Sequence, residues 1–236
     1  MSLYFALKKS YKVLPKGLRH ALYVMTPDPL KKLRSRVVEG MEDGANHDEI
    51  YDSTYYAEKV EPSIQLSADQ MADTIIRDFA PHTIADVGCG TGKLLAALRE
   101  RGAEVQGFEY SAAALKLCHE RGLDVVRFDI EGDPVPTARV DLVVSTEVAE
   151  HLPESCADKY LEILTTLAPT VVLTAATPGQ PGNDHVNLQP NEYWIDKLEK
   201  LGYTFDAVKT RSWRSEWEAN DVHWIYYHSI MVFQRR

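Results

Sequence analysis

A glycine-rich turn that follows an apolar run places the strongest constraint on how this chain folds. Residues 83–87 form the run, which carries Asp86 near its end and leads into Gly88, Gly90 and Gly92 before an apolar helical segment. Glycine is needed where the backbone takes positive φ or approaches a ligand without a Cβ in the way. A strand that feeds such a turn places the ligand at the carboxyl edge of a parallel sheet. The turn therefore predicts a nucleotide-type cofactor site.

The spacing of the turn argues against two common classes of cofactor. A triphosphate loop needs G-x-x-x-x-G-K-[ST], but these glycines are one residue too close together and Lys93 is followed by Leu94. A dinucleotide fingerprint needs G-x-G-x-x-G, and the Asp86 carboxylate would repel a pyrophosphate. Glu109 ends a second apolar run and suits a pair of ribose hydroxyls, which NAD and other adenosine cofactors share. These residues indicate a ribose and leave the cofactor open.

Four motifs in chain order resemble those of the class I S-adenosylmethionine (SAM) dependent methyltransferases, and the resemblance covers roughly residues 60–236. The motifs are residues 86–92, 107–111, 128–130 and 143–148. The resemblance implies that Asp86 and the turn meet the aminocarboxypropyl end of SAM, Glu109 its ribose and Asp129 its adenine. Acids suit this cofactor because SAM is a cation without phosphates. The implied cofactor-binding residues are Asp86, Gly88, Cys89, Gly90, Glu109, Tyr110, Asp129, Ile130 and Thr146, with Tyr110 and Ile130 flanking the purine.

The alternation of apolar runs predicts an α/β fold, a Rossmann-like doubly wound sheet that is mostly parallel. We expect strands near 84–88, 104–109, 124–128, 140–145 and 170–175, and helices near 67–79, 92–101, 111–121, 153–167 and 190–201. Residues 203–209 and 224–233 are interpreted as closing strands, the last one antiparallel as the resemblance implies. Trp213 and Trp217 lie in a polar stretch, so we expect them in a lid over the acceptor site or simply packed in the core.

The charge of the chain is divided unevenly. The chain of 236 residues has a net charge of −9, yet residues 1–40 hold nine lysines and arginines against two acids, a net charge near +7. The basic segment predicts two short amphipathic helices that pack on the acidic remainder, in cis or across a homodimer; contact with a membrane surface or polyanion is the alternative. We therefore expect a helical extension over 1–60 that also acts as a lid, and a methyltransferase domain over 61–236.

Composition excludes several other classes of partner. An acidic body does not suit tracking of nucleic-acid phosphates. No apolar stretch is long enough to predict an integral membrane segment, and the first residues do not form a secretory signal. Three cysteines without C-x-x-C spacing suggest neither a disulfide framework nor a zinc site, which favours the cytoplasm. Cys89 sits inside the glycine turn, where a small packed side chain is a better interpretation than a nucleophile.

The fourth predicted strand leads into the residues that we expect to carry the chemistry. If a helical turn begins at Glu147, the spacing puts Glu147, Glu150 and His151 on one face. This face suits a divalent metal or acid–base work. The alternative is that these polar groups only cap the start of a helix.

A second polar segment, residues 177–190, follows the fifth strand and contains His185. Because both segments lie at the carboxyl edge of the sheet, Glu147, Glu150, His151 and His185 are expected to converge as a metal site. A similar set is the metal site of small-RNA 3′-terminal 2′-O-methyltransferases, and ubiquinone-pathway O-methyltransferases are related in requiring a divalent ion. The resemblance implies Mg²⁺ or a similar ion. No RNA-binding module is recognisable in the chain.

The mechanism expected from this cofactor requires a nucleophile held beside the methyl group and a base for its proton. His151 and His185 are the candidate catalytic bases. The loop pattern is similar to that of bacterial methyltransferases from polysaccharide and natural-product pathways, which favours a small-molecule acceptor, a sugar or oligosaccharide hydroxyl. A phenol or catechol acceptor is the alternative, and so is a SAM-binding protein without catalysis.

Overall fold

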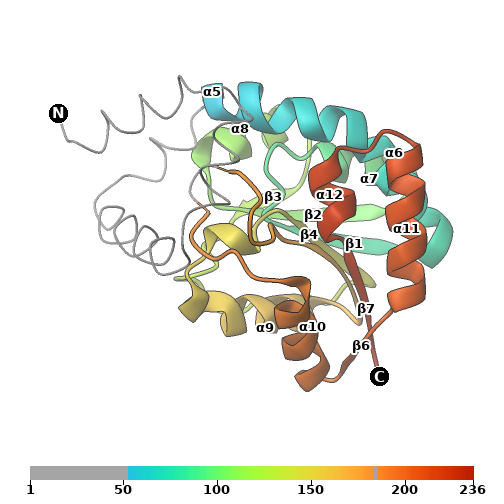
Figure 1. The fold of residues 1–236 in the computed structure, drawn as a ribbon. Coiled ribbons are helices and arrows are strands. Elements are labelled where there is room, and N and C mark those ends of the chain that lie inside the picture. The colour runs from blue at the N-terminus through green and yellow to red at the C-terminus, as the bar shows by residue number, and fades with distance from the viewer. Residues whose placement is uncertain (1–52, 183–184) are drawn as a thin grey trace.

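The computed structural model describes residues 53–182 and 185–236, and it shows a seven-stranded sheet covered by helices on both faces (Figure 1). The strand order is β3-β2-β1-β4-β5-β7-β6. The strands are β1 (Thr83–Val87), β2 (Glu104–Glu109), β3 (Val125–Arg127), β4 (Leu142–Thr146), β5 (Thr170–Thr174), β6 (Tyr203–Phe205) and β7 (Met231–Arg235). β1 to β5 pair in parallel, whereas β7 is antiparallel to both β5 and β6. The expected Rossmann-like architecture with an antiparallel last strand is confirmed.

Helices separate the parallel strands except β3 and β4, as the alternation of the sequence predicts. They are α5 (Ser53–Tyr55), the π-helix η1 (Tyr56–Val60), α6 (Glu61–Phe79), α7 (Lys93–Glu100), α8 (Ala112–Glu120), the 3₁₀ helices η2 (Ala149–His151) and η3 (Glu154–Cys156), α9 (Ala157–Leu167), α10 (Asn191–Lys200), α11 (Ala207–Ala219) and α12 (Trp224–Ser229). None of the helices in the described part of the chain is long and apolar enough to cross a membrane. The expected helical segments within residues 1–40 lie outside the described residues.

The sheet lies between two apolar layers because its strands alternate their side chains. Ala85 and Val87 of β1 pack toward α9 and α10, while Ile84 packs toward α6, α7, α11 and α12. β4 repeats the pattern, with Val143 on the first face and Val144 on the second. Both faces of the central strands are therefore buried, which explains their continuous apolar runs. Figure 1 shows α11 and α12 on the side of α6 and α7, away from α9 and α10.

The region after β6 differs from the expectation. Residues 224–229 form a helix, although their aromatic run suggests a strand, because a short apolar run does not distinguish the two by periodicity. Residues 207–219 also form a helix. The side chain of Asp206, which precedes this helix, caps its first turn by accepting a hydrogen bond from the Lys209 amide. Trp213 and Trp217 of this helix are fully buried. They belong to the core, and the hypothesis that they form a lid over the acceptor site is wrong.

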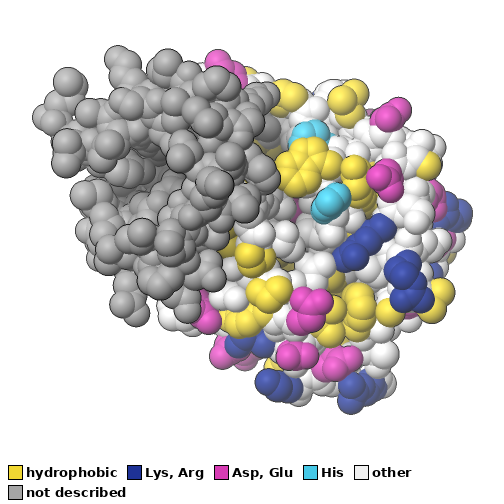
Figure 2. All heavy atoms as spheres, viewed as in Figure 1, with side chains coloured by type: hydrophobic (Ala, Val, Ile, Leu, Met, Phe, Trp, Pro, Cys, Tyr) yellow, Lys and Arg dark blue, Asp and Glu magenta, His cyan; other side chains and the backbone are white. Residues whose placement is uncertain are grey.

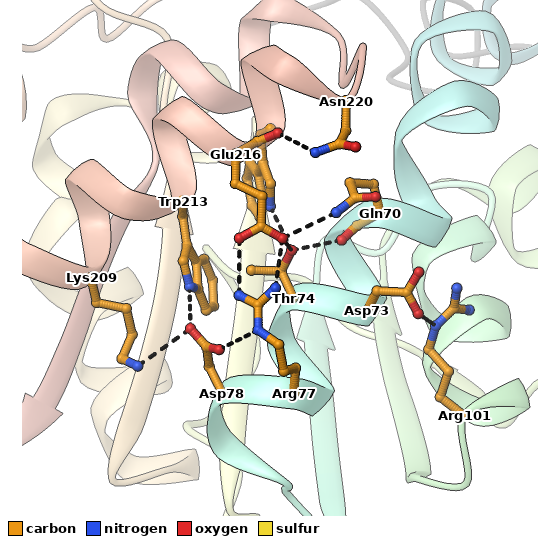
Figure 3. A network of polar contacts seen from close by, with 11 residues as sticks. Gln70, Asp73, Thr74, Arg77, Asp78, Arg101, Lys209, Trp213, Glu216 and Asn220 are labelled. Atoms are coloured by element: carbon orange, nitrogen blue, oxygen red, sulfur yellow. Dashed lines mark hydrogen bonds and ion pairs between the residues drawn. The ribbon is translucent and has the colours of Figure 1, made fainter.

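Ion pairs and indole hydrogen bonds fasten α11 to α6 (Figure 3). Arg77 of α6 donates two hydrogen bonds to Glu216 of α11, at 2.6 and 3.0 Å. Asp78 accepts a hydrogen bond of 2.7 Å from the indole nitrogen of Trp213. The indole of Trp217 donates to the Thr74 hydroxyl at 3.1 Å. A buried indole that keeps a hydrogen-bond partner gains the packing of a large ring without leaving its polar atom unsatisfied.

We expect Trp217→Ala to lower the free energy of unfolding by about 3–5 kcal/mol, because it removes a fully buried ring and leaves a cavity between α6 and α11. Chemical denaturation followed by circular dichroism measures this change. Val208→Ala on the same helix is the control, since its side chain is 72% exposed and such a change alters stability by at most ~0.5 kcal/mol. Equal stability of the two variants would contradict the described packing of α11.

Candidate functional site

The glycine turn lies between β1 and α7 at the carboxyl edge of the sheet. Gly88, Gly90 and Gly92 have φ values of 75°, 53° and 73°, the left-handed region that the sequence predicts for them. A Cβ at Gly88 would lie 2.4 Å from a methyl group of Val148, which follows β4. The turn therefore takes a backbone path open to glycine, and it packs directly against the loop after β4.

Asp86 is a buried carboxylate behind this turn. Only 2% of the residue is exposed, and its Oδ1 atom has no hydrogen-bond partner among the described residues. Burial, together with the nearby charge of Glu109, raises the pKa of Asp86 to about 8. A cationic group that enters the site would favour the ionised form of Asp86, which makes this carboxylate a suitable partner for an ammonium group.

Glu109 ends β2 beside the same turn and is held by the backbone. It accepts hydrogen bonds of 2.8 Å from the amides of Gly90, Tyr110 and Ser111. Burial raises the pKa of Glu109, and these hydrogen bonds to the ionised form oppose the rise. The carboxylate thus has a fixed position before any ligand binds. Tyr56 of η1 is buried, and its burial together with the charge of Glu109 raises the pKa of its hydroxyl.

The other predicted cofactor residues lie at the ends of neighbouring strands. The ring of Tyr110 is 5.0 Å from the guanidinium of Arg127. Asp129 follows β3, where its Oδ1 accepts a hydrogen bond of 2.8 Å from the Glu131 amide. Ile130 packs partly against the core, and Thr146 is the last residue of β4.

Cys89 is a packed residue of the turn. It is buried in a small cluster with Cys118, Leu95 and Leu123. A hydrogen bond with Cys118 and burial both raise the pKa of the Cys89 thiol. Since the thiolate is the nucleophilic form, this environment suits packing rather than covalent chemistry.

The loop after β4 does not take the helical path expected for Glu147. Glu147 has a φ of 55°, a left-handed conformation rare for a residue with a side chain, and the 3₁₀ helix η2 begins only at Ala149. Its carboxylate accepts hydrogen bonds from Gln180 at 2.6 Å and Ser229 at 3.2 Å. Glu147 is therefore turned toward the loop after β5 and toward α12, two partners that the spacing of the sequence does not reveal.

Three of the four predicted metal-site residues come together. Glu150, His151 and His185 each offer a ligand atom, and these atoms lie within 4.8 Å of one another. The rings of His151 and His185 meet edge to face with centroids 5.0 Å apart. The amides of Val186 and Asn187 donate to the Glu150 carbonyl at 2.8 and 3.0 Å, which brings His185 to this position.

Glu150 is the most confined acid of the cluster. The residue is fully buried, and neither of its carboxylate oxygens has a hydrogen-bond partner in the described part of the chain. Burial and the charge of Glu147 raise the pKa of Glu150 well above its usual range. A buried carboxylate in this state is stabilised by a proton or by a bound cation. The group can therefore take up either one.

The known proteins to which this chain is similar are methyltransferases. Residues 85–174 match the family model described as a methyltransferase domain. The chain is 26% identical to a magnesium protoporphyrin IX methyltransferase of Arabidopsis thaliana over 66% of its own length and 50% of the relative's. It is 36% identical to a ubiquinone biosynthesis O-methyltransferase of Nitrosomonas europaea over 35% and 38% of the two lengths. The chain thus spans about half or less of the curated relatives that it matches.

The fold is also found in solved structures. The plantazolicin methyltransferase BpumL, solved in complex with SAH (S-adenosylhomocysteine), aligns with a TM-score of 0.55 at 14% identity, covering 89% of this chain and 98% of that one. At this identity the likeness concerns the fold alone. Taken with the family match over β1 to β5 and the glycine turn that carries Asp86, it leads to one conclusion. This chain contains a methyltransferase domain over residues 85–174 and has the fold of the class I SAM-dependent methyltransferases.

Proposed function

We propose that this protein is an SAM-dependent O-methyltransferase that acts on a hydroxyl of a small polyhydroxylated acceptor. The observation that carries the proposal is the contact between the two halves of the site. Val148 packs against Gly88, so the cluster of Glu150, His151 and His185 lies close to the glycine turn. A base beside a methyl donor is what transfer to a hydroxyl requires. The relative named as a ubiquinone biosynthesis O-methyltransferase supports oxygen as the acceptor atom.

The carboxylates of the turn fit this cofactor. SAM supplies a methyl group on a positively charged sulfur, and it also carries an ammonium group. Asp86 has a buried oxygen without a hydrogen-bond partner among the described residues, and it would bind the ammonium. Glu109 would accept the ribose hydroxyls, since an ionised carboxylate accepts more hydrogen bonds than three amides supply. Tyr110, Asp129 and Ile130 would surround the adenine.

The imidazoles would carry the proton. An alcohol is a poor nucleophile while it keeps its proton, and histidine is the side chain that exchanges protons near neutral pH. His151 and His185 meet ring to ring beside the buried carboxylate of Glu150. One imidazole would accept the hydroxyl proton, and the carboxylate would stabilise the imidazolium that forms.

The same cluster fits a divalent metal ion. Glu150 has two buried oxygens without hydrogen bonds to described residues, and two imidazoles lie within reach. One carboxylate and two imidazoles favour Mn²⁺, Fe²⁺ or Zn²⁺ over Mg²⁺, which prefers oxygen ligands. The donors therefore favour a transition metal rather than the expected Mg²⁺. Such an ion would lower the pKa of a hydroxyl held beside it. Glu147 keeps its hydrogen bonds to Gln180 and Ser229 and is a neighbour of this metal site.

We expect the affinity for SAH to weaken as the pH falls from 7 to 5. The pKa of Asp86 is raised to about 8, so the free protein holds a proton there that binding of the SAH ammonium displaces. Binding then releases a proton, and the dissociation constant rises up to about tenfold for each pH unit lost. Isothermal titration calorimetry in buffers of different ionisation enthalpy measures both the dissociation constant and the number of protons released.

Asp86→Asn is the informative variant in this titration, and Asp69→Asn on the exposed side of α6 is its control. The Asp86 variant should bind weakly and without proton release, while the control behaves as the wild type. A pH-independent affinity in the wild type would contradict the role of Asp86.

We expect His151→Ala and His185→Ala to lower kcat for methyl transfer by about 10²- to 10⁴-fold, the usual worth of a positioned base, while SAH still binds. Transfer of a labelled methyl group is measured to cis-diol sugars and to catechols. His82→Ala is the control, because the His82 side chain is exposed on the surface and lies near the exposed carboxylate of Glu104. If the wild type binds SAH but methylates none of the acceptors, a non-catalytic SAM-binding protein is favoured. If it methylates catechols alone, the phenol alternative is favoured.

We expect the SAH complex to bind one Mn²⁺ or Zn²⁺ ion more tightly than Mg²⁺, because the donors are two imidazoles and one carboxylate. Calorimetric titration of each ion measures the difference. Glu150→Gln and His185→Ala should each abolish binding, whereas Glu147→Gln should reduce it less. If the wild type binds none of the three ions, a histidine base that acts alone becomes the account of the chemistry.

A further inference from the structure

A surface pocket lies beside helix α12. Its volume is about 440 Å³, and the loop after β5 and the helix α12 form its walls. The lining residues are Thr177, Pro178, Gly179, Gln180, Pro181, Trp224 and His228. Figure 2, in the same view as Figure 1, shows histidine and hydrophobic side chains gathered on the surface in the region of α12. We call this pocket the Trp224 groove.

Trp224 differs from the other three tryptophans of the chain. Trp194, Trp213 and Trp217 are fully buried, whereas 39% of Trp224 is exposed. Its ring lies 6.0 Å from the ring of His223 and 5.9 Å from that of His228, measured between centroids. A ligand that covers this exposed aromatic ring removes apolar surface from water, which favours binding.

The groove is connected to the proposed catalytic site through Glu147. Gln180 lines the groove and donates a hydrogen bond of 2.6 Å to the Glu147 carboxylate. Ser229, the residue after His228, donates to the other oxygen of Glu147 at 3.2 Å. The two walls of the groove therefore meet at a residue only three positions before Glu150. A ring held in the groove would lie against Gln180, which binds Glu147 of the loop that leads to Glu150.

The chemistry of the lining selects a neutral ligand. None of the described lining residues is a lysine, arginine, aspartate or glutamate, so no fixed charge compensates a carboxylate or an amine on the ligand. Thr177, Gln180 and His228 bring side chains that form hydrogen bonds, while Trp224 and the prolines are apolar. A sugar ring has an apolar face of polarised C–H bonds, which suits the negative face of an indole, and hydroxyls around its edge. A phenol would leave most of these polar groups without a partner.

We propose that the Trp224 groove binds a neutral sugar ring, with its apolar face on Trp224 and its hydroxyls toward Thr177, Gln180 and His228. Only the statement that this ring belongs to the methyl acceptor rests on the proposed function. Binding of the ring is a property of the groove itself. It is therefore measured without turnover, and with or without SAH.

Saturation-transfer NMR with methyl α-mannopyranoside, which carries a cis-diol, tests the proposal at millimolar probe concentration. Catechol is the second probe. We expect saturation transfer to the ring protons of the mannoside in the wild type. In Trp224→Ala we expect the affinity for the mannoside to fall roughly fivefold or more, the scale of one lost aromatic contact. Trp224→Phe should retain most of the signal. Leu66→Ala, which removes an exposed apolar side chain elsewhere, should retain all of it.

Each outcome has a distinct meaning. Mannoside binding that is unchanged in Trp224→Ala, or absent from the wild type, overturns the assignment of a sugar to the groove. Saturation transfer to catechol and not to the mannoside, if it is lost in Trp224→Ala, overturns the sugar assignment in favour of an aromatic ligand. Binding of SAH by the same variants, measured by calorimetry, shows that they are folded. If the mannoside binds through Trp224 but no methyl transfer is found, the groove stands and the proposed function fails.

Discussion

Buried negative charge at the carboxyl edge of the sheet is the constraint on which the rest of the site depends. Asp86, Glu109, Glu147 and Glu150 end or follow three neighbouring strands, and burial raises the pKa of each one. A carboxylate removed from water must find a proton, a hydrogen-bond donor or a cation. Glu109 and Glu147 find donors within the protein, whereas Asp86 and Glu150 keep oxygens without them in the described structure. Those two acids are accordingly the places where a positively charged ligand gains most.

Much of the fold follows from local sequence because each signal is contained in one segment. The glycine turn, the alternating apolar runs and Glu109 at the end of β2 lie within a few residues of where they are predicted. α11 was not predicted, although Thr210, Trp213 and Trp217 have the three- and four-residue spacing of a buried helical stripe. The polar residues between the tryptophans hide this stripe, because only one face of α11 is buried. α12 was missed for the opposite reason, since its aromatic run is too short to show a period.

The proposed catalytic cluster could be predicted in part. Parallel strands bring their following loops to one edge, which is why Glu150, His151 and His185 were expected together and lie together. The conformation of Glu147 was not predictable from spacing. Its left-handed backbone is accompanied by contacts with Gln180 and Ser229, which lie 33 and 82 residues further along the chain. Pairs at that separation are set by the tertiary fold, and a single sequence carries no signal for them.

The close fit of Val148 against Gly88 has a consequence for how the sequence of this site can change in evolution. A side chain at position 88 would overlap Val148, so the turn after β1 and the loop after β4 are in direct contact. This contact limits how far the loop that carries Glu150 can lie from the glycine turn. The loop 177–181 and the helix α12 take no part in this contact, although Gln180 and Ser229 bind Glu147. Substitutions of Trp224 or His228 would therefore change the Trp224 groove without altering the contact between Val148 and Gly88.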